Sequence, residues 1–126
     1  MPEHLQIINL TDHTVIVGNK NEVKLILSPS GKIARCYMKL ENVGVVDGIP
    51  LCRIRWEKAT NLPPKRKGVM YLVSQIVFDN TDRDDLLAPD TTKRSVIKDG
   101  QGNTIAVKRL RVKEGFSIDK ILGVKE

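Results

Sequence analysis

Short runs of β-type residues, each closed by a turn signal, constrain the fold of this chain more than any other feature of its sequence. In the first half, runs rich in Val, Ile and Leu alternate with Ser-Pro-Ser-Gly, Asp-Gly-Ile-Pro and similar turn sequences. The runs occupy residues 5–10, 14–18, 23–27, 32–40, 43–46 and 51–56. Such a density of short strands and turns predicts antiparallel pairing. We therefore expect antiparallel sheets in a sandwich-like or barrel-like arrangement.

The second half adds two short helices to this pattern. Residues 70–73 predict a strand, and the apolar side chains that follow recur at helical spacing, so we expect a short helix over 74–80. Residues 94–98 and 104–113 flank an Asp-Gly-Gln-Gly-Asn sequence that is typical of a hairpin turn. A serine cap and a terminal glycine predict a last short helix over 117–122. The predicted fold class is mainly β with one or two short helices.

Composition sets the size and the class of the protein. The 126 residues, 40% of them hydrophobic, predict a single domain over residues 1–126. No apolar run approaches the roughly 20 residues that span a bilayer, and the N-terminus lacks the pattern of a secretory signal. We therefore expect an intracellular, cytoplasmic protein that makes no membrane contact. Cys36 and Cys52 are too few for a disulfide framework or a zinc cage, and both are predicted to be buried.

The charge is distributed unevenly. The net charge is +6, yet five of the fifteen acidic residues fall within residues 79–90. Such a loop needs a cation or its own backbone donors to organise it, so it is a candidate site. Asp82, Asp84 and Asp85 could accept hydrogen bonds from ribose hydroxyls, as an acidic residue does in dinucleotide-binding folds. A second interpretation is that the loop binds a divalent cation. A third is that its aspartates cap local backbone N–H groups while Arg83 forms an ion pair across the loop.

Two arginine pairs are candidate phosphate ligands. Read as one strand, residues 104–113 place Arg109 and Arg111 on one face, about 7 Å apart. Arg53 and Arg55 share a face in the same way. Guanidinium groups bind phosphate bidentately, and this spacing suits the two phosphates of a diphosphate. The alternative is that both pairs are solvated outer faces of a sheet.

Signals for catalysis are weak. His13 could act as a general base, but no Ser or Cys nucleophile lies in a recognisable elbow, and no phosphate-binding glycine loop or zinc motif is present. We expect no catalytic residues and no cofactor. The Lys65-Arg66-Lys67 loop leaves open a module that binds a protein or nucleic acid.

Four sequence elements resemble those of a family of small proteins encoded by bacteriophages, prophages and bacteria. They are N-L-T-x-H at 9–13, P-S-G-x-x-A-R at 29–35, V-S-x-I-V at 73–77 and D-R-D-D-L-L-A-P-D at 82–90. The resemblance extends over most of the chain through Asp90 and carries over no catalytic residues. Asp12 replaces the proline more usual at its position. Small basic phage proteins include sponges that sequester nucleotide immune signals, and this analogy of size, charge and context agrees with the arginine pairs.

The sequence therefore favours a phage-type binding protein that captures a small nucleotide-derived immune signal, such as a cyclic ADP-ribose isomer or a cyclic oligonucleotide. The four arginines would hold phosphates, the three aspartates would receive sugar hydroxyls, and Phe78 or Trp56 would stack on a base. Many short strands with edges to cover favour a homo-oligomer. The alternatives are a nucleotide hydrolase or lyase that uses His13 with the acidic loop, and the interaction module.

Overall fold

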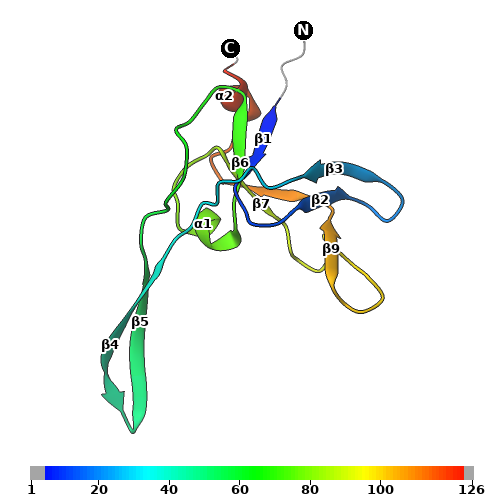
Figure 1. Cartoon of the computed structure of the whole chain (residues 1–126). Helices are drawn as coiled ribbons and strands as arrows, with labels where there is room; N and C mark the ends of the chain where they lie inside the picture. Colours follow the sequence, from blue (N-terminus) through cyan, green and yellow to red (C-terminus); the bar gives the residue numbers. More distant parts are fainter. Residues whose placement is uncertain (1–4, 124–126) are drawn as a thin grey trace.

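The computed structural model describes residues 5–123 and contains ten strands and two short helices over that range (Figure 1). The elements are β1 (Gln6–Asn9), β2 (Val15–Gly18), β3 (Val23–Leu27), β4 (Met38–Val46), β5 (Ile49–Trp56), β6 (Val69–Leu72), α1 (Gln75–Asp79), β7 (Leu86–Pro89), β8 (Val96–Lys98), β9 (Thr104–Val107), β10 (Leu110–Val112) and α2 (Ile118–Leu122). The predicted mainly β class with two short helices is confirmed. The predictions of a single domain over 1–126 and of no N-terminal signal extend to residues 1–4 and 124–126, which lie outside the described residues.

A four-stranded sheet in the order β1-β6-β7-β10 forms the centre of the molecule. The pairs β1–β6 and β6–β7 are parallel, and only β10 runs antiparallel to its neighbour β7. The sequence of β6, Val-Met-Tyr-Leu, is apolar throughout and every residue is buried, as expected of a strand covered on both faces. The antiparallel pairing predicted from the turns is thus combined with parallel pairing at the centre. Three strands consequently end at the same edge of the sheet, which we call the carboxyl edge.

The side chains of β6 alternate between two hydrophobic clusters, one on each face of the central sheet. On one face Tyr71 packs with Val77 and Phe78 of α1, and on the other Leu72 packs with Ile121 of α2. Both helices begin where the sequence predicts. Ser74 caps α1 and Ser117 caps α2, each by accepting a backbone hydrogen bond from three residues ahead.

The segment predicted as one strand over residues 104–113 is broken in two. β9 belongs to a second four-stranded sheet, in the order β3-β2-β9-β8, whereas β10 belongs to the central sheet. The buried Ser95 hydroxyl holds the crossing point, because it accepts from the backbone N–H of both Lys108 and Arg109, at 3.1 and 3.3 Å. The prediction that one continuous strand face carries Arg109 and Arg111 is therefore wrong.

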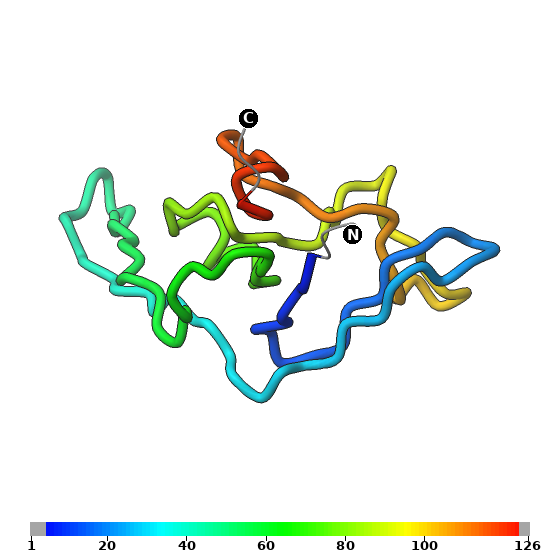
Figure 2. Tube along the Cα trace, turned by 90° about the horizontal axis from the view of Figure 1, so that it is seen from above, coloured from blue at the N-terminus to red at the C-terminus, as the bar shows by residue number. Residues whose placement is uncertain are grey.

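Strands β4 and β5 form a long hairpin that projects from the rest of the molecule, and we call it the arm (Figure 1). Residues 38–40, the end of the run predicted over 32–40, join the run predicted over 43–46 in one strand, with a register shift between Asn42 and Gly44, whereas residues 32–37 lie outside the strands. Asp47 and Gly48 both have positive φ, 51° and 77°, which defines a type I′ turn at the tip. Seen from above, the arm and the β2–β3 hairpin lie on opposite sides of the central sheet (Figure 2).

The prediction that both cysteines are buried is wrong. Cys36 is half-buried, and Cys52 is exposed on the arm. The apolar alternation around Cys52 belongs to a strand without a covering layer. Within the described range, no helix combines the length and the hydropathy needed to cross a membrane.

The β8–β9 turn yields a stability prediction. Gly102 has φ of 84°, a conformation that costs any residue with a Cβ, whereas Gly100 has no positive φ and open space around it. We expect Gly102→Ala to destabilise the protein by about 1 kcal/mol and Gly100→Ala to be neutral or slightly stabilising, because it reduces the entropy of the unfolded chain. Urea denaturation of both variants measures this. Equal stabilities of the two variants would contradict the turn geometry.

Candidate functional site

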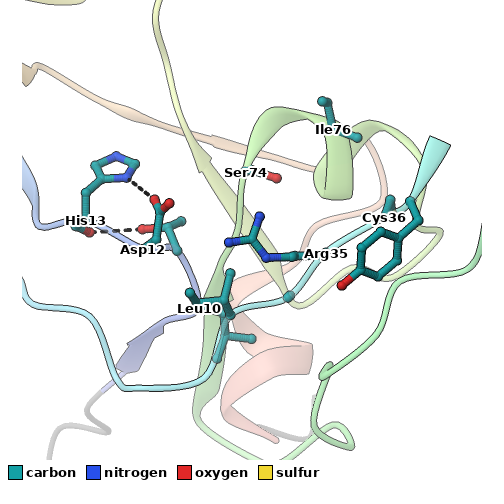
Figure 3. A pocket seen from close by; sticks show the side chains of 11 residues that line it. Leu10, Asp12, His13, Arg35, Cys36, Ser74 and Ile76 are labelled. Carbon is teal, nitrogen blue, oxygen red and sulfur yellow. Dashed lines mark hydrogen bonds and ion pairs between the residues drawn. The ribbon is translucent and has the colours of Figure 1, made fainter.

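A pocket of about 320 Å³ opens at the carboxyl edge of the central sheet (Figure 3). Three segments that are far apart in sequence line it: residues 10–13 after β1, residues 33–37 before β4, and Ser74 with Ile76 after β6. The carboxyl ends of parallel strands are where open α/β sheets bind their ligands, because the loops that leave neighbouring strands diverge there. The volume lies within the range of small-molecule sites. We call this cavity the carboxyl-edge pocket.

Asn9, which ends β1, fixes the shape of the loop over residues 9–13. Its side chain is 1% exposed and has all four of its strong hydrogen-bonding positions occupied. The amide nitrogen donates to the carbonyl oxygens of His13 and Leu27, at 2.9 and 2.8 Å. The amide oxygen accepts from the backbone N–H and the hydroxyl of Thr11, at 2.9 and 2.6 Å. One buried side chain therefore sets the position of His13 at the mouth of the pocket.

The second wall of the pocket is attached to the first through backbone hydrogen bonds. Ser30 N–H donates to the Asn9 carbonyl and Ala34 N–H to the Leu10 carbonyl, both at 3.0 Å. Arg35 pairs through its backbone with Thr60. The Arg35 side chain is exposed and, among residues 5–123, makes no hydrogen bond or ion pair that would occupy its guanidinium. In Figure 3 this side chain points toward Asp12 and away from Cys36.

Asp12 and His13 form a hydrogen-bonded pair on the opposite side of the pocket. The carboxylate lies 3.1 Å from His13 Nδ1, and both side chains are exposed to solvent. The hydrogen bond with His13 lowers the pKa of the Asp12 carboxyl below its usual value, and the charge of Arg35 acts in the same direction. Asp12 is therefore an anion at neutral pH, and the second ring nitrogen of His13 is free to meet a ligand.

The pocket thus combines three kinds of recognition group. The unpaired Arg35 guanidinium can bind a phosphate or carboxylate in a bidentate manner. Asp12 can accept hydrogen bonds from hydroxyl groups, and the exposed ring of Tyr37 offers an aromatic surface. The Ser74 hydroxyl already accepts from the Val77 N–H as a helix cap, and no hydrogen bond joins Ser74 to His13 within the described chain. Ser74 therefore acts as a helix cap at the wall of the pocket.

The predicted arginine pairs do not meet in one site. Arg109 lies at the crossing between two sheets, where its Nε donates to Asp90 at 2.6 Å. Arg111 of β10 donates to Gln75 and Asp79, and its guanidinium lies 4.4 Å from the centre of the Phe78 ring. Intramolecular partners therefore engage both guanidinium groups.

Arg53 and Arg55 lie in β5 of the arm, both near Glu41, at 3.7 and 3.9 Å. Trp56 is at the base of the arm, paired with Met38 across the hairpin. These three residues belong to the two-stranded sheet of the arm, whereas Arg111 belongs to the central sheet and Arg109 lies between β9 and β10. The structure therefore distributes the predicted phosphate ligands over separate surfaces.

Phe78, predicted to stack on a base, is a core residue. Its side chain is 3% exposed and belongs to the hydrophobic cluster under α1. Arg111 and Lys113 both place their cationic groups 4.4 Å from the ring centre. The ring is therefore engaged in cation–π contacts within the chain and offers no open face to a ligand.

Cations of the chain itself organise the acidic loop. Arg83 donates to both carboxylate oxygens of Asp85, at 2.9 and 2.6 Å, and Asp85 is 1% exposed. This pair raises the pKa of the Arg83 guanidinium, and the hydrogen bond from Lys65 lowers the pKa of Asp84. Asp82 is exposed. These contacts agree with the structural reading of the loop that the sequence left open.

The basic loop and the acidic loop meet at the opposite, amino edge of the central sheet. Lys65, Arg66 and Lys67 line a cavity of about 490 Å³ there, together with Asp84, Asp85 and Lys120. Asp82, Asp84 and Asp85 precede β7, whereas His13 lies beyond the carboxyl end of β1, so strand polarity separates them. Over the part of the chain that the structure describes, no group of three or more His, Cys, Asp or Glu side chains could hold a metal ion.

No family model matches this chain, and no curated protein or solved structure matches it either. The candidate site therefore stands on geometry alone.

Three of the short sequence elements described above contain residues that line or shape this site. Asn9, His13 and Arg35 all lie in the elements N-L-T-x-H and P-S-G-x-x-A-R, and Ser74 lies in V-S-x-I-V. Residues from three of the four short sequence elements thus meet at the carboxyl-edge pocket. The fourth supplies the Arg83–Asp85 ion pair at the other edge.

Proposed function

We propose that this protein is a non-enzymatic binding protein for a small phosphate-bearing ligand of the nucleotide class, held in the carboxyl-edge pocket. The observation that carries the proposal is the convergence of three distant segments on one cavity, together with the Arg35 guanidinium, which has no side-chain partner among residues 5–123. Arg35 would hold a phosphate, Asp12 would receive sugar hydroxyls, and Tyr37 would contact the base. The second ring nitrogen of His13 would accept a hydrogen bond from a further hydroxyl of the ligand.

The ligand class follows from the mixture of charges. A simple anion would gain nothing from the Asp12 carboxylate, and a simple sugar would leave Arg35 without a partner. A nucleotide carries an anionic group, hydroxyls and an aromatic ring in one molecule, so it can use all three groups. The net charge of +6 would assist the capture of such anions.

Within this class we propose nucleotide-derived immune signals as the first ligands to test, with the protein acting in the cytoplasm of an infected bacterium. Cyclic ADP-ribose isomers and cyclic dinucleotides are the corresponding probes. The phage-family resemblance and the small, basic character of the chain support this choice. Sequestration fits a pocket in which Ser74 already serves as a helix cap and His13 has no nucleophile bonded to it.

The first test is titration calorimetry with ADP-ribose, cyclic ADP-ribose isomers and cyclic di-AMP. For the probe that binds, we expect Arg35→Ala to cost about 1.5–3 kcal/mol of binding free energy, typical of a hydrogen bond to a charged group. Folding stability should hardly change, because the Arg35 side chain is exposed and unpaired within the described residues. Two other arginine variants test whether a loss of affinity is specific to the carboxyl-edge pocket.

Arg94→Ala is the matched control, since Arg94 is exposed and lines none of the four principal cavities. Arg66→Ala tests the basic cavity at the amino edge. A loss of affinity confined to Arg66→Ala would move the site to that cavity, and binding of random DNA with a steep salt dependence would favour the interaction module. Heat release followed by chromatography reports the fate of the probe. Recovery of a converted product would show that the protein is an enzyme and would refute the proposal of sequestration.

A further inference from the structure

The arm lacks the covering layer that a hairpin of its composition needs. Every residue of β4 and β5 is exposed, and the two strands pair only with each other. A two-stranded hairpin is marginally stable in water unless a hydrophobic face packs against something else. Figure 1 shows the arm extending away from the central sheet. The arm therefore exposes a surface that the rest of the chain does not use.

The two faces of the arm differ in chemistry. Cross-strand partners share a face, so the pairs Met38–Trp56, Leu40–Ile54 and Asn42–Cys52 lie on one side. Val45–Pro50 lies on the same side, because Pro50 is two residues from Cys52 in β5. We call this uncharged face the stripe; its residues are Met38, Leu40, Asn42, Val45, Pro50, Cys52, Ile54 and Trp56.

The opposite face of the arm is charged near its base. It carries Lys39 opposite Arg55 and Glu41 opposite Arg53, a balance of three cations to one anion. Closer to the tip it is apolar, with Leu51 and the pair Val46–Ile49. The arm is therefore amphipathic near its base and apolar on both sides at its tip.

The exposed apolar area is large for a monomer. The large apolar side chains of the stripe are between 37% and 68% exposed. With the tip residues of the opposite face, the arm presents roughly 900 Å² of apolar surface, and the stripe alone is at the upper end of the roughly 300–600 Å² of the largest patch on a typical monomer. The stripe alone contributes roughly 600 Å² per chain, so two stripes in contact would bury about 1,200 Å², the lower limit of a specific interface.

We propose that the stripe is a homodimer interface, in which the arms of two copies of this chain pack face to face as a small β-sandwich. Two sheets in this arrangement lie about 10 Å apart and share an apolar core. The proposal concerns assembly and does not depend on the identity of any ligand.

Charge favours a second copy packed through the stripe. The stripe bears no charged side chain, so two copies bring no like charges together. The opposite face, with Lys39, Arg53 and Arg55, would repel its own copy but remains in solvent when the stripes meet. A two-fold interface requires such a self-complementary surface. The same packing supplies the missing layer for both hairpins at once.

The first experiment measures the mass of the full chain by sedimentation between about 1 and 200 μM, for the wild type and for two Ile→Asp variants. Ile54 lies on the stripe and is 51% exposed; Ile26 lies in β3 and is 59% exposed. We expect a wild-type dimer, a dimer at least about 30-fold weaker for Ile54→Asp, as for an interface hot spot, and no change for Ile26→Asp. A monomeric wild type at 200 μM, or equal effects of the two variants, would overturn the proposal.

A second measurement uses Cys52, which needs no change in the stripe. In a Cys36→Ser background Cys52 is the only thiol, and it is exposed in the isolated chain. Dimerisation through the stripe should slow its reaction with a maleimide at high protein concentration and restore fast reaction on dilution. A rate independent of concentration, over the range in which sedimentation reports a dimer, would place the interface elsewhere and refute the proposal. This labelling rate also tests the dimer interface if Ile54→Asp fails to fold.

Discussion

Replacing Asn9 by alanine should lower the free energy of unfolding by about 3–4 kcal/mol, although the residue lies at the end of a strand and contributes little hydrophobic surface. Four hydrogen bonds end on this one side chain, and it is 1% exposed. Each net hydrogen bond contributes on the order of 1 kcal/mol, and a buried partner left unsatisfied adds to the loss. Denaturant titration followed by circular dichroism measures the effect.

Asn21→Ala is the matched control. Asn21 lies in the exposed β2–β3 turn, and its amide side chain makes no hydrogen bond within the described residues, so its replacement should change stability by less than about 0.5 kcal/mol. Nearly equal stabilities of Asn9→Ala and Asn21→Ala would contradict the hydrogen-bond network that shapes the pocket.

The second large effect is expected at Asp85. Asp85→Asn keeps the size of the side chain but removes the charge that neutralises Arg83, whose side chain is 22% exposed. Breaking a buried ion pair on one side leaves the other charge uncompensated, and we expect a loss of about 2–4 kcal/mol. Asp82→Asn, in the same loop but exposed, should fall within about 0.5 kcal/mol of the wild type.

This pair of variants also separates two roles for the acidic loop. If Asp85 bound sugar hydroxyls, as its sequence context first favoured, its replacement would weaken ligand binding and leave the melting temperature unchanged. A structural role predicts the reverse: a lower melting temperature with the affinity of each folded molecule intact. Calorimetry and thermal denaturation on the same samples distinguish these outcomes.

The local structure was predictable because local signals determine it. The serine caps of α1 and α2 and the Asp-Gly turn at the tip of the arm follow from neighbouring residues, and the structure contains all three. The parallel pairing of β1, β6 and β7 was not predictable from turns, since these strands are separated by long stretches of chain. The uniformly apolar Val-Met-Tyr-Leu of β6 was the available indication of a central strand.

The placement of the arginine pairs was not predictable for a related reason. An arginine in a sequence shows its charge but not its partner, and Arg109 and Arg111 find theirs in residues 19 to 36 positions away. Period-two alternation placed both on one face only as long as 104–113 was a single strand. The crossing at Lys108 and Arg109 depends on a hydroxyl from Ser95, which no local pattern indicates.

Tyr37 connects the arm to the carboxyl-edge pocket, and this connection would couple ligand binding to dimerisation. Tyr37 lines the pocket, immediately precedes β4, and accepts a hydrogen bond from the Glu57 N–H at 2.9 Å, which closes the base of the hairpin. A ligand that held Tyr37 in place would, through this connection, also restrict movement at the base of the arm. Occupancy and self-association would then be linked reciprocally. Because the dimer has two pockets, a ligand that tightens the fully occupied dimer about tenfold binds each pocket of the dimer about threefold more tightly than the pocket of the monomer. Such linkage would appear as an affinity that rises with protein concentration, a signature that neither the pocket nor the arm would produce alone.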